Sequence, residues 1–264
     1  MPTLTELQSL SGRVAVITGG AGHLGQAMGQ ALAELGCRVA LVDRNRDALN
    51  AAAKRLGINP EDCMVADLEQ EASRIALADA ASSELGGVDI LINNAAFVGD
   101  SELQGWATAF EKQQLDTWRR ALEVNLTAPF HLVQLLHGHL RASGKGSVIN
   151  VGSIYGLLGP DWALYQGTAM ANPAAYAASK GGLIQLTRWL STTLAPHVRV
   201  NAISPGGIAR GQPESFARRY VERTPLARMG REDDFLGIVA FLASDASAWV
   251  TGQNFAVDGG WSAW

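Results

Sequence analysis

Short apolar runs alternate with longer amphipathic stretches along almost the whole chain. The runs are rich in branched residues, which is typical of strands buried on both faces of a sheet. They occupy residues 13–18, 38–43, 63–67, 89–94, 146–153, 198–205 and 254–260. Between them, apolar positions recur at helical spacing in residues 24–35, 46–56, 71–85, 115–140, 176–195 and 233–243. This alternation predicts one α/β domain over residues 1–264, a doubly wound, seven-stranded parallel sheet with helices on both faces.

The overall composition narrows the class of protein but does not identify it. The 264 residues are 47% hydrophobic and 17% charged, with a net charge of −4. We therefore expect no nucleic-acid partner and no membrane association, because no basic stripe and no long apolar run is present. The first residues lack the pattern of a secretory signal, and Cys37 and Cys63 fit buried thiols better than a disulfide. The expected location is the cytoplasm, and no metal site is expected.

The first candidate site is the glycine-rich sequence TGGAGHLG at residues 18–25, between the first strand and the first helix. Gly20, Gly22 and Gly25 fit the spacing G-x-G-x-x-G, which lets a backbone turn tightly against a pyrophosphate at a helix N-terminus. The motif alone is a weak signal, but its place in the first βα unit favours dinucleotide binding in a Rossmann-type fold.

Asp43 ends the second strand, where an acidic residue can accept a hydrogen bond from the adenosine 2′-hydroxyl. Its charge would repel a 2′-phosphate, so it favours NAD over NADP. The neighbouring Arg44 argues the other way, because a guanidinium at this position could hold that phosphate.

The candidate for proton transfer is Tyr176. A phenol has a pKa near 10, so a nearby ammonium helps it to act as a base near neutral pH. Among the tyrosines only Tyr176 is followed by a lysine one helical turn later, Lys180. Ser153 ends the preceding strand and faces the expected ligand crevice, although a serine there could also simply cap a loop.

Taken together, these motifs resemble the classical short-chain dehydrogenase/reductase family over nearly the whole chain. The matching residues include 18–25, Asp43, ADL at 66–68, NNAA at 93–96, Asn125, Ser153, Tyr176, Lys180 and PGG at 205–207. The resemblance implies that residues 12–150 form a nucleotide-binding half and residues 151–264 a catalytic and substrate half. It also implies a small-molecule substrate and a homotetramer built on the two long helices and the C-terminal strand region. The apolar Leu183, Leu186 and Leu190 fit burial in such an interface or in the core of the chain itself.

The same resemblance assigns roles to individual residues. Tyr176 would be the general acid/base, Ser153 would orient the reacting oxygen, and Lys180 would bind the nicotinamide ribose and lower the pKa of the tyrosine. Asn125 would hold a water that links Lys180 to solvent. The remaining cofactor-binding residues would be Gly19, Gly22, His23, Leu24, Gly25, Asp43, Arg44, Asp67, Leu68, Asn93, Ala95, Pro205, Gly206 and Ile208. His23 replaces a glycine of the family pattern and would either reach the pyrophosphate or cap the helix.

The spacing between Ser153 and Tyr176 is longer than the family usually has. The additional segment, residues 160–173, either walls the substrate pocket or makes an oligomer contact. In the first case its aromatic and polar side chains would suit a polyhydroxy ring. The candidate substrate residues are Tyr155, Trp162, Tyr165 and Gln166. This segment and a second one, residues 97–114, resemble the bacterial subgroup found with flagellin-modification and surface-polysaccharide proteins.

The sequence therefore predicts an NAD-dependent oxidoreductase that interconverts a secondary alcohol and a ketone, on a sugar-like substrate. One alternative is an NADPH-linked 3-ketoacyl-thioester reductase, which Asp43 and the polar segment disfavour. Another is a dinucleotide sensor without catalysis, which would not need Asn125, Ser153, Tyr176 and Lys180 together.

Overall fold

Seven parallel strands form one sheet in the computed structural model, which describes residues 1–98 and 103–264. The strands are β1 (Val14–Thr18), β2 (Arg38–Asp43), β3 (Cys63–Val65), β4 (Ile90–Asn93), β5 (Gly146–Val151), β6 (Val198–Pro205) and β7 (Asn254–Val257). Their order in the sheet is β3-β2-β1-β4-β5-β6-β7. The order reverses between β1 and β4, which is where a doubly wound sheet opens a crevice for ligands beyond the carboxyl ends of its strands.

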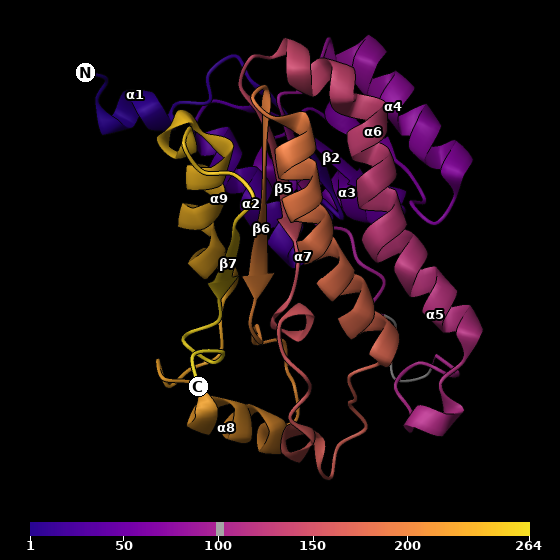
Figure 1. Cartoon of the computed structure of the whole chain (residues 1–264). Helices are drawn as coiled ribbons and strands as arrows, with labels where there is room; N and C mark the ends of the chain where they lie inside the picture. Colours follow the sequence, from indigo (N-terminus) through magenta and orange to yellow (C-terminus); the bar gives the residue numbers. More distant parts are fainter. Residues whose placement is uncertain (99–102) are drawn as a thin grey trace.

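Helices cover both faces of this sheet. They are α1 (Leu4–Gln8), α2 (His23–Glu34), α3 (Arg46–Leu56), α4 (Glu71–Leu85), α5 (Leu115–Leu122), α6 (Ala128–Ala142), α7 (Ala174–Leu194), α8 (Glu214–Arg223) and α9 (Leu236–Ala243). In Figure 1, α9 and α7 lie on opposite sides of β6, and α8 lies beyond the tips of the β6 and β7 arrows, near the C-terminus. Thus α8 stands at the end of the sheet where the ligand crevice is expected.

The apolar core has two halves, because successive strand residues point to opposite faces of the sheet. One half packs strand residues against α2 and α9 and includes Ile17, Leu41, Ile149, Met28, Leu32 and Val239. The other packs strand residues against α4, α6 and α7 and includes Val16, Val42, Val148, Leu77, Leu136 and Leu190. This two-sided burial explains why the strands read as continuous apolar runs in the sequence.

The sequence prediction is confirmed for the sheet and differs in detail for some helices. The helix expected over residues 115–140 is divided by a π-helical turn, Glu123–Thr127, and α9 is preceded by a 3₁₀ turn at Glu232–Phe235. The short N-terminal helix α1 was not expected. Cys37 and Cys63 are buried free thiols, as predicted. None of the helices in the described part of the chain has both the length and the apolar character needed to cross a membrane.

The three leucines that fitted either a subunit contact or the core of the chain pack into the core. Leu183 and Leu190 are 1% and 4% exposed, and both belong to the interior of this chain. Leu186 is partly buried against the same core as Leu190. These side chains are therefore used for packing α7 onto its own sheet, because that face of the helix covers the sheet.

Candidate active site

The loop between β1 and α2 passes so close to neighbouring backbone that two of its positions require glycine. Gly19 has a left-handed backbone with φ of +63°, and a Cβ there would lie 2.9 Å from the Ala95 Cα. A Cβ on Gly25 would lie 2.3 Å from the Gly19 carbonyl oxygen. Larger residues would have to displace main chain, so the glycines preserve a path that leaves room for a phosphate group.

The start of α2 completes this cradle. Gly22 is the N-cap, and none of the described side chains caps the first turn. Its N–H groups and the positive end of the helix dipole are therefore available to a pyrophosphate. His23 is the exposed first residue of the helix, and Leu24 is partly buried against the core. The expected contact of His23 with the pyrophosphate stays a prediction.

Beside the glycine loop lies a cavity of about 360 Å³ at the ends of β1 to β4. Its lining includes the predicted cofactor residues Gly19, Asp43, Arg44, Asp67, Leu68 and Ala95. One Asp43 carboxylate oxygen, Oδ1, accepts a 3.3 Å hydrogen bond from the Asn45 main chain. No hydrogen bond from a described residue engages its other oxygen, which can accept from a ribose hydroxyl. Arg44 is exposed at the edge of the same cavity, so both residues can meet the 2′ position of an adenosine.

The two asparagines at the end of β4, Asn93 and Asn94, make different contacts. Asn93 is 2% exposed and its Nδ2 donates to Asn150 Oδ1 at 2.8 Å, inside the core. Its neighbour Asn94 holds the glycine loop, because its Nδ2 donates to the carbonyls of Thr18 and Gly19 at 3.0 and 3.1 Å. Asn94 belongs to the NNAA motif at 93–96, on which the family resemblance partly rests. Of these two side chains, only that of Asn94 supports the nucleotide side directly.

Ser153, Tyr176 and Lys180 come together where β5 meets α7. Lys180 is 2% exposed, and its Nζ lies 5.9 Å from the centre of the Tyr176 ring. The same Nζ donates a 2.7 Å hydrogen bond to the carbonyl of Val151, which fixes the side chain under the tyrosine. A Cβ on Gly156 would lie 2.7 Å from the Lys180 carbonyl carbon, so a glycine is needed for the turn after Ser153 to pack this closely on α7.

Burial changes the acidity of both groups. It raises the pKa of Tyr176, and the hydrogen bond with Ser153 works in the opposite direction. Burial lowers the pKa of Lys180 to about 8. At neutral pH Tyr176 is therefore a phenol that can donate a proton, and Lys180 is an ammonium that favours the phenoxide when the proton leaves. This pairing is suited to general acid and general base work in the two directions of one reaction.

Asn125 lies in the π-helical turn and is completely buried. Its Oδ1 accepts a 2.6 Å hydrogen bond from the Phe97 main chain, and its Nδ2 donates to Ser179 Oγ at 3.0 Å. The side chain thus ties the loop after β4 to α7, next to Lys180. Since its oxygen is already engaged, the expected water relay from Lys180 to solvent stays a prediction.

The end of β6 continues the crevice. Pro205 is the last residue of β6, and the Gly207 N–H donates a 2.6 Å hydrogen bond to the Tyr220 hydroxyl. A Cβ on Gly206 would lie 2.8 Å from Asp258 Cα, so only glycine fits between β6 and the segment after β7. Ile208 follows in a short bridge to Gly230. Tyr220 therefore has a structural role, which agrees with its lack of a lysine partner.

The segment 160–173 packs against α8 through two arginines. Arg219 donates to the carbonyl of Gln166 at 2.7 Å, and Arg223 forms an ion pair with Asp161. Sequence reasoning did not identify this contact, because the partners lie more than 50 residues apart in the chain. The side chain of Tyr165 is 9% exposed and its hydroxyl lies 2.5 Å from that of Tyr155.

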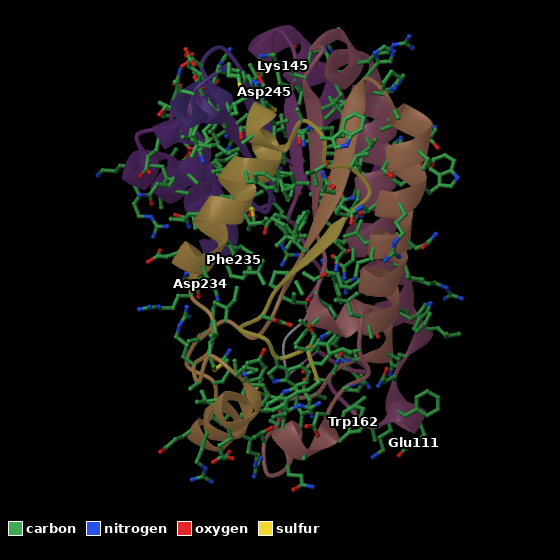
Figure 2. All side chains as sticks on the ribbon, turned by 60° about the vertical axis from the view of Figure 1, so that its left-hand side comes forward. Glu111, Lys145, Trp162, Asp234, Phe235 and Asp245 are labelled. Atoms are coloured by element: carbon green, nitrogen blue, oxygen red, sulfur yellow. The ribbon has the colours of Figure 1, made fainter. Side chains whose placement is uncertain are left out.

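Tyr155, Tyr165 and Tyr176 line a second cavity of about 350 Å³. The other two substrate candidates lie elsewhere, which corrects the expectation that they share this wall. Trp162 is 57% exposed and borders a neighbouring depression with Phe110, and Gln166 is exposed. Figure 2 shows Trp162 near Glu111, at the end of the molecule opposite Lys145 and Asp245. The physical reason is the anchoring to α8, which turns these two side chains away from the Tyr176 cavity.

The described residues contain no cluster of three or more His, Cys, Asp or Glu side chains that could hold a metal ion. The chemical groups that the structure brings together are the dinucleotide cradle and the Ser–Tyr–Lys group. A doubly wound fold that holds a dinucleotide beside a tyrosine poised for proton transfer defines an oxidoreductase of the Rossmann type.

Comparisons with known proteins identify the family. The family model described as Enoyl-(Acyl carrier protein) reductase matches residues 19–262. Cis-4-hydroxycyclohexanecarboxylate dehydrogenase of Sinomonas cyclohexanicum is 32% identical, over 97% of this chain and 99% of that protein. Galactitol 2-dehydrogenase (L-tagatose-forming) of Cereibacter sphaeroides is 33% identical, over 97% of each. The crystal structure of a gluconate 5-dehydrogenase from Burkholderia cenocepacia J2315, in complex with NADP and tartrate, has a TM-score of 0.85 and 29% identity, covering 99% of this chain and 100% of that one. The chain belongs to the classical short-chain dehydrogenase/reductase family.

Proposed function

We propose that the protein interconverts a secondary alcohol and a ketone on a sugar-like or polyhydroxy substrate. The observation that carries this proposal is the position of Tyr176 on the wall of an open cavity, with Ser153 and Lys180 beside its ring. The related galactitol and gluconate dehydrogenases support the substrate class. The flagellin-modification subgroup, a cytoplasmic location and a homotetramer belong to the same proposal.

The fit of a nicotinamide dinucleotide rests on the cradle. A Cβ on Gly19 or Gly25 would collide with main-chain atoms, so the loop can follow this path only with glycine, and Gly19 itself lines the cavity bordered by Asp43. When bound, the dinucleotide supplies a hydride acceptor for oxidation and a hydride donor for reduction. The glycine loop would hold its pyrophosphate, and the residues of the cavity would hold its adenosine.

In the reaction, the side chains of the protein orient the substrate oxygen and transfer one proton to or from it. In oxidation, Ser153 donates to the substrate oxygen, and Tyr176 as phenoxide takes the hydroxyl proton as the carbon loses a hydride. In reduction, the Tyr176 phenol returns that proton to the oxygen. Lys180 holds positive charge beneath the ring, which stabilises the phenoxide in both directions.

We propose that Asp43 allows the protein to use NAD. Arg44 lines the same cavity, and the Burkholderia relative was solved with NADP, so NADP is proposed as a second cofactor on an equal footing. The ratio of kcat/KM for the two cofactors decides between them.

The experiment is an absorbance assay of nicotinamide reduction over a panel of galactitol, gluconate, simple secondary alcohols and, in reverse, a 3-ketoacyl thioester. We expect turnover of polyhydroxy compounds above that of the thioester. Tyr176→Phe should lower turnover about 10²–10⁴-fold, while cofactor binding measured by fluorescence stays unchanged. Equal turnover by wild type and Tyr176→Phe, or activity on the thioester alone, would contradict the proposal.

A further inference from the structure

The cavity beside Tyr176 contains a polar side chain with unused hydrogen-bonding capacity. The lining combines apolar groups with polar ones and includes Trp106, Met170, Tyr155, Tyr165, Asn172 and Tyr176. Asn172 is 5% exposed, and neither its amide nitrogen nor its amide oxygen has a hydrogen-bond partner among the residues that the structure describes. A buried amide without partners is rare in native proteins, because its desolvation is then uncompensated.

The backbone holds Asn172 firmly in this place. Pro173 follows it and is the N-cap of α7, which carries Tyr176 in its first turn. A residue before proline is confined to extended conformations. The next N–H, of Ala174, donates a 3.0 Å hydrogen bond to Gln113 Oε1, which fixes the entry to the helix. Asn172 is thus positioned by the same helix start that positions the catalytic phenol.

The amide can reach the cavity without breaking an existing interaction. Its polar atoms are covered from solvent, and the residue stands between the Tyr176 cavity and the depression near Phe110. A turn of its side chain toward the Tyr176 cavity, which the residue lines, is the movement that binding requires. The Asn172 amide makes no hydrogen bond to another described residue, so such a turn breaks no hydrogen bond to these residues. It allows the amide to form new hydrogen bonds with a ligand.

A second polar pair stands on the same cavity wall. The hydroxyls of Tyr155 and Tyr165 are 2.5 Å apart, so one donates to the other and the second retains a free proton. Burial, and then the closeness of Tyr165, raise the pKa of Tyr155, and burial also raises that of Tyr165. Both remain phenols at neutral pH, and the pair can offer one donor and several lone pairs to a ligand.

We propose that Asn172, together with the Tyr155–Tyr165 pair, binds a hydroxyl group on the carbon next to the one at which Tyr176 acts. A neutral amide offers both a donor and an acceptor, which is the complement of a hydroxyl. A ligand with one hydroxyl at the reacting carbon and another beside it would satisfy the amide, whereas a simple secondary alcohol would leave it unpaired. The subsite therefore selects 1,2-diols, and this inference rests on the proposed alcohol oxidation.

The test compares two alcohols that share a ring and differ by one hydroxyl, cyclohexane-1,2-diol (cis and trans) and cyclohexanol. The wild type should oxidise at least one diol isomer with a kcat/KM at least about tenfold above that of cyclohexanol, because a site with polar groups rejects a ligand that leaves them unpaired. Asn172→Leu, which keeps the size and removes both polar atoms, should abolish this preference. The loss should fall mainly on KM for the diol, with cyclohexanol turnover unchanged or raised. Tyr165→Phe should lower diol selectivity in the same direction.

Thermal melting of Asn172→Leu separates this binding role from a structural one. If the amide lacks partners in the folded chain, the variant should melt at the same temperature or higher. A lower melting temperature, with equal losses on diol and cyclohexanol, would show that Asn172 supports the fold, for example through a buried water, and would overturn the subsite. Cyclohexanol turnover without any diol preference in the wild type would overturn the subsite and leave the proposed function intact. Absence of turnover of every alcohol would overturn both.

Discussion

Replacing Lys180 by methionine should show how much of the reaction depends on the charge beneath Tyr176. The ammonium lies 5.9 Å from the ring centre and is almost fully buried. With an effective dielectric constant of about 20, two unit charges at this distance attract by about 3 kcal/mol. This attraction favours the phenoxide about a hundredfold. Without the ammonium, less Tyr176 phenoxide is present at a given pH, but the phenoxide that does form is a stronger base. The second effect partly offsets the first, so we expect a loss of about 10- to 100-fold in kcat for alcohol oxidation.

The pH dependence makes this prediction sharper. Burial lowers the pKa of Lys180 to about 8, so its charge is present below that pH and is lost as the pH rises through it. The ratio of wild-type to Lys180→Met kcat should therefore be largest below about pH 8 and should shrink above it. The assay is the initial rate of nicotinamide reduction at saturating cofactor and alcohol across this range, which separates chemistry from weaker ribose binding.

A matched control removes the same charge far from the site. Lys145 precedes β5 and pairs with Asp245 at 2.8 Å, at the end of the molecule opposite Trp162 (Figure 2). Lys145→Met should leave the rate profile unchanged. If Lys180→Met kept the wild-type kcat at pH 7, or if its deficit were the same at every pH, the electrostatic reasoning would be refuted.

Three further predictions concern the cofactor and the assembly. Asp43→Ala should lower kcat/KM for NAD and raise the ratio for NADP over NAD, and an unchanged ratio in steady-state kinetics would rule out Asp43 as the 2′-hydroxyl acceptor. Gly25→Ala places a Cβ 2.3 Å from a carbonyl oxygen, so it should weaken cofactor binding by about 5- to 150-fold, given about 1–3 kcal/mol for an overpacked site. Gly22→Ala, whose Cβ would stand 3.2 Å from the same oxygen, should cost less in the same titration, and the reverse order would count against the cradle. Light scattering should give the mass of a homotetramer, and a monomer at micromolar concentration would contradict that proposal.

The sheet was predictable from sequence because both of its faces are buried. A strand such as β2 (Arg38–Asp43), with four successive buried apolar residues, must be apolar along its length to pack under helices on both sides. The glycine-rich loop was also predictable from sequence. The glycine spacing that ends at Gly25 is one that few other folds require. The π-helical turn at Asn125 was not visible, because the residues around it continue the same helical pattern on either side.

The segment before Tyr176 shows where sequence reasoning lost precision. Its aromatic residues predicted a substrate wall, yet only Tyr165 lies on the cavity and Trp162 lies outside it. The path of the segment depends on Arg219, which donates to Gln166 from 53 residues further along the chain. No local pattern encodes such a contact, so composition could indicate the chemistry of the segment but not which side chains face the ligand.

Asn172 was even harder to recognise from sequence, because its distinguishing feature is the lack of a hydrogen-bond partner. In the sequence it is one polar residue before a proline, in a stretch where a turn or cap would account for it equally well. Only the folded structure shows its amide as the buried group beside Tyr176 whose donor and acceptor find no partner among the residues that the structure describes. A buried polar group without a partner in its own chain needs an explanation, and a bound substrate is the one proposed for Asn172. Burying an amide without hydrogen bonds is costly, so such a group is rare in an ordinary core. On the wall of the Tyr176 cavity it therefore points to a ligand, because a substrate can supply the missing hydrogen bonds.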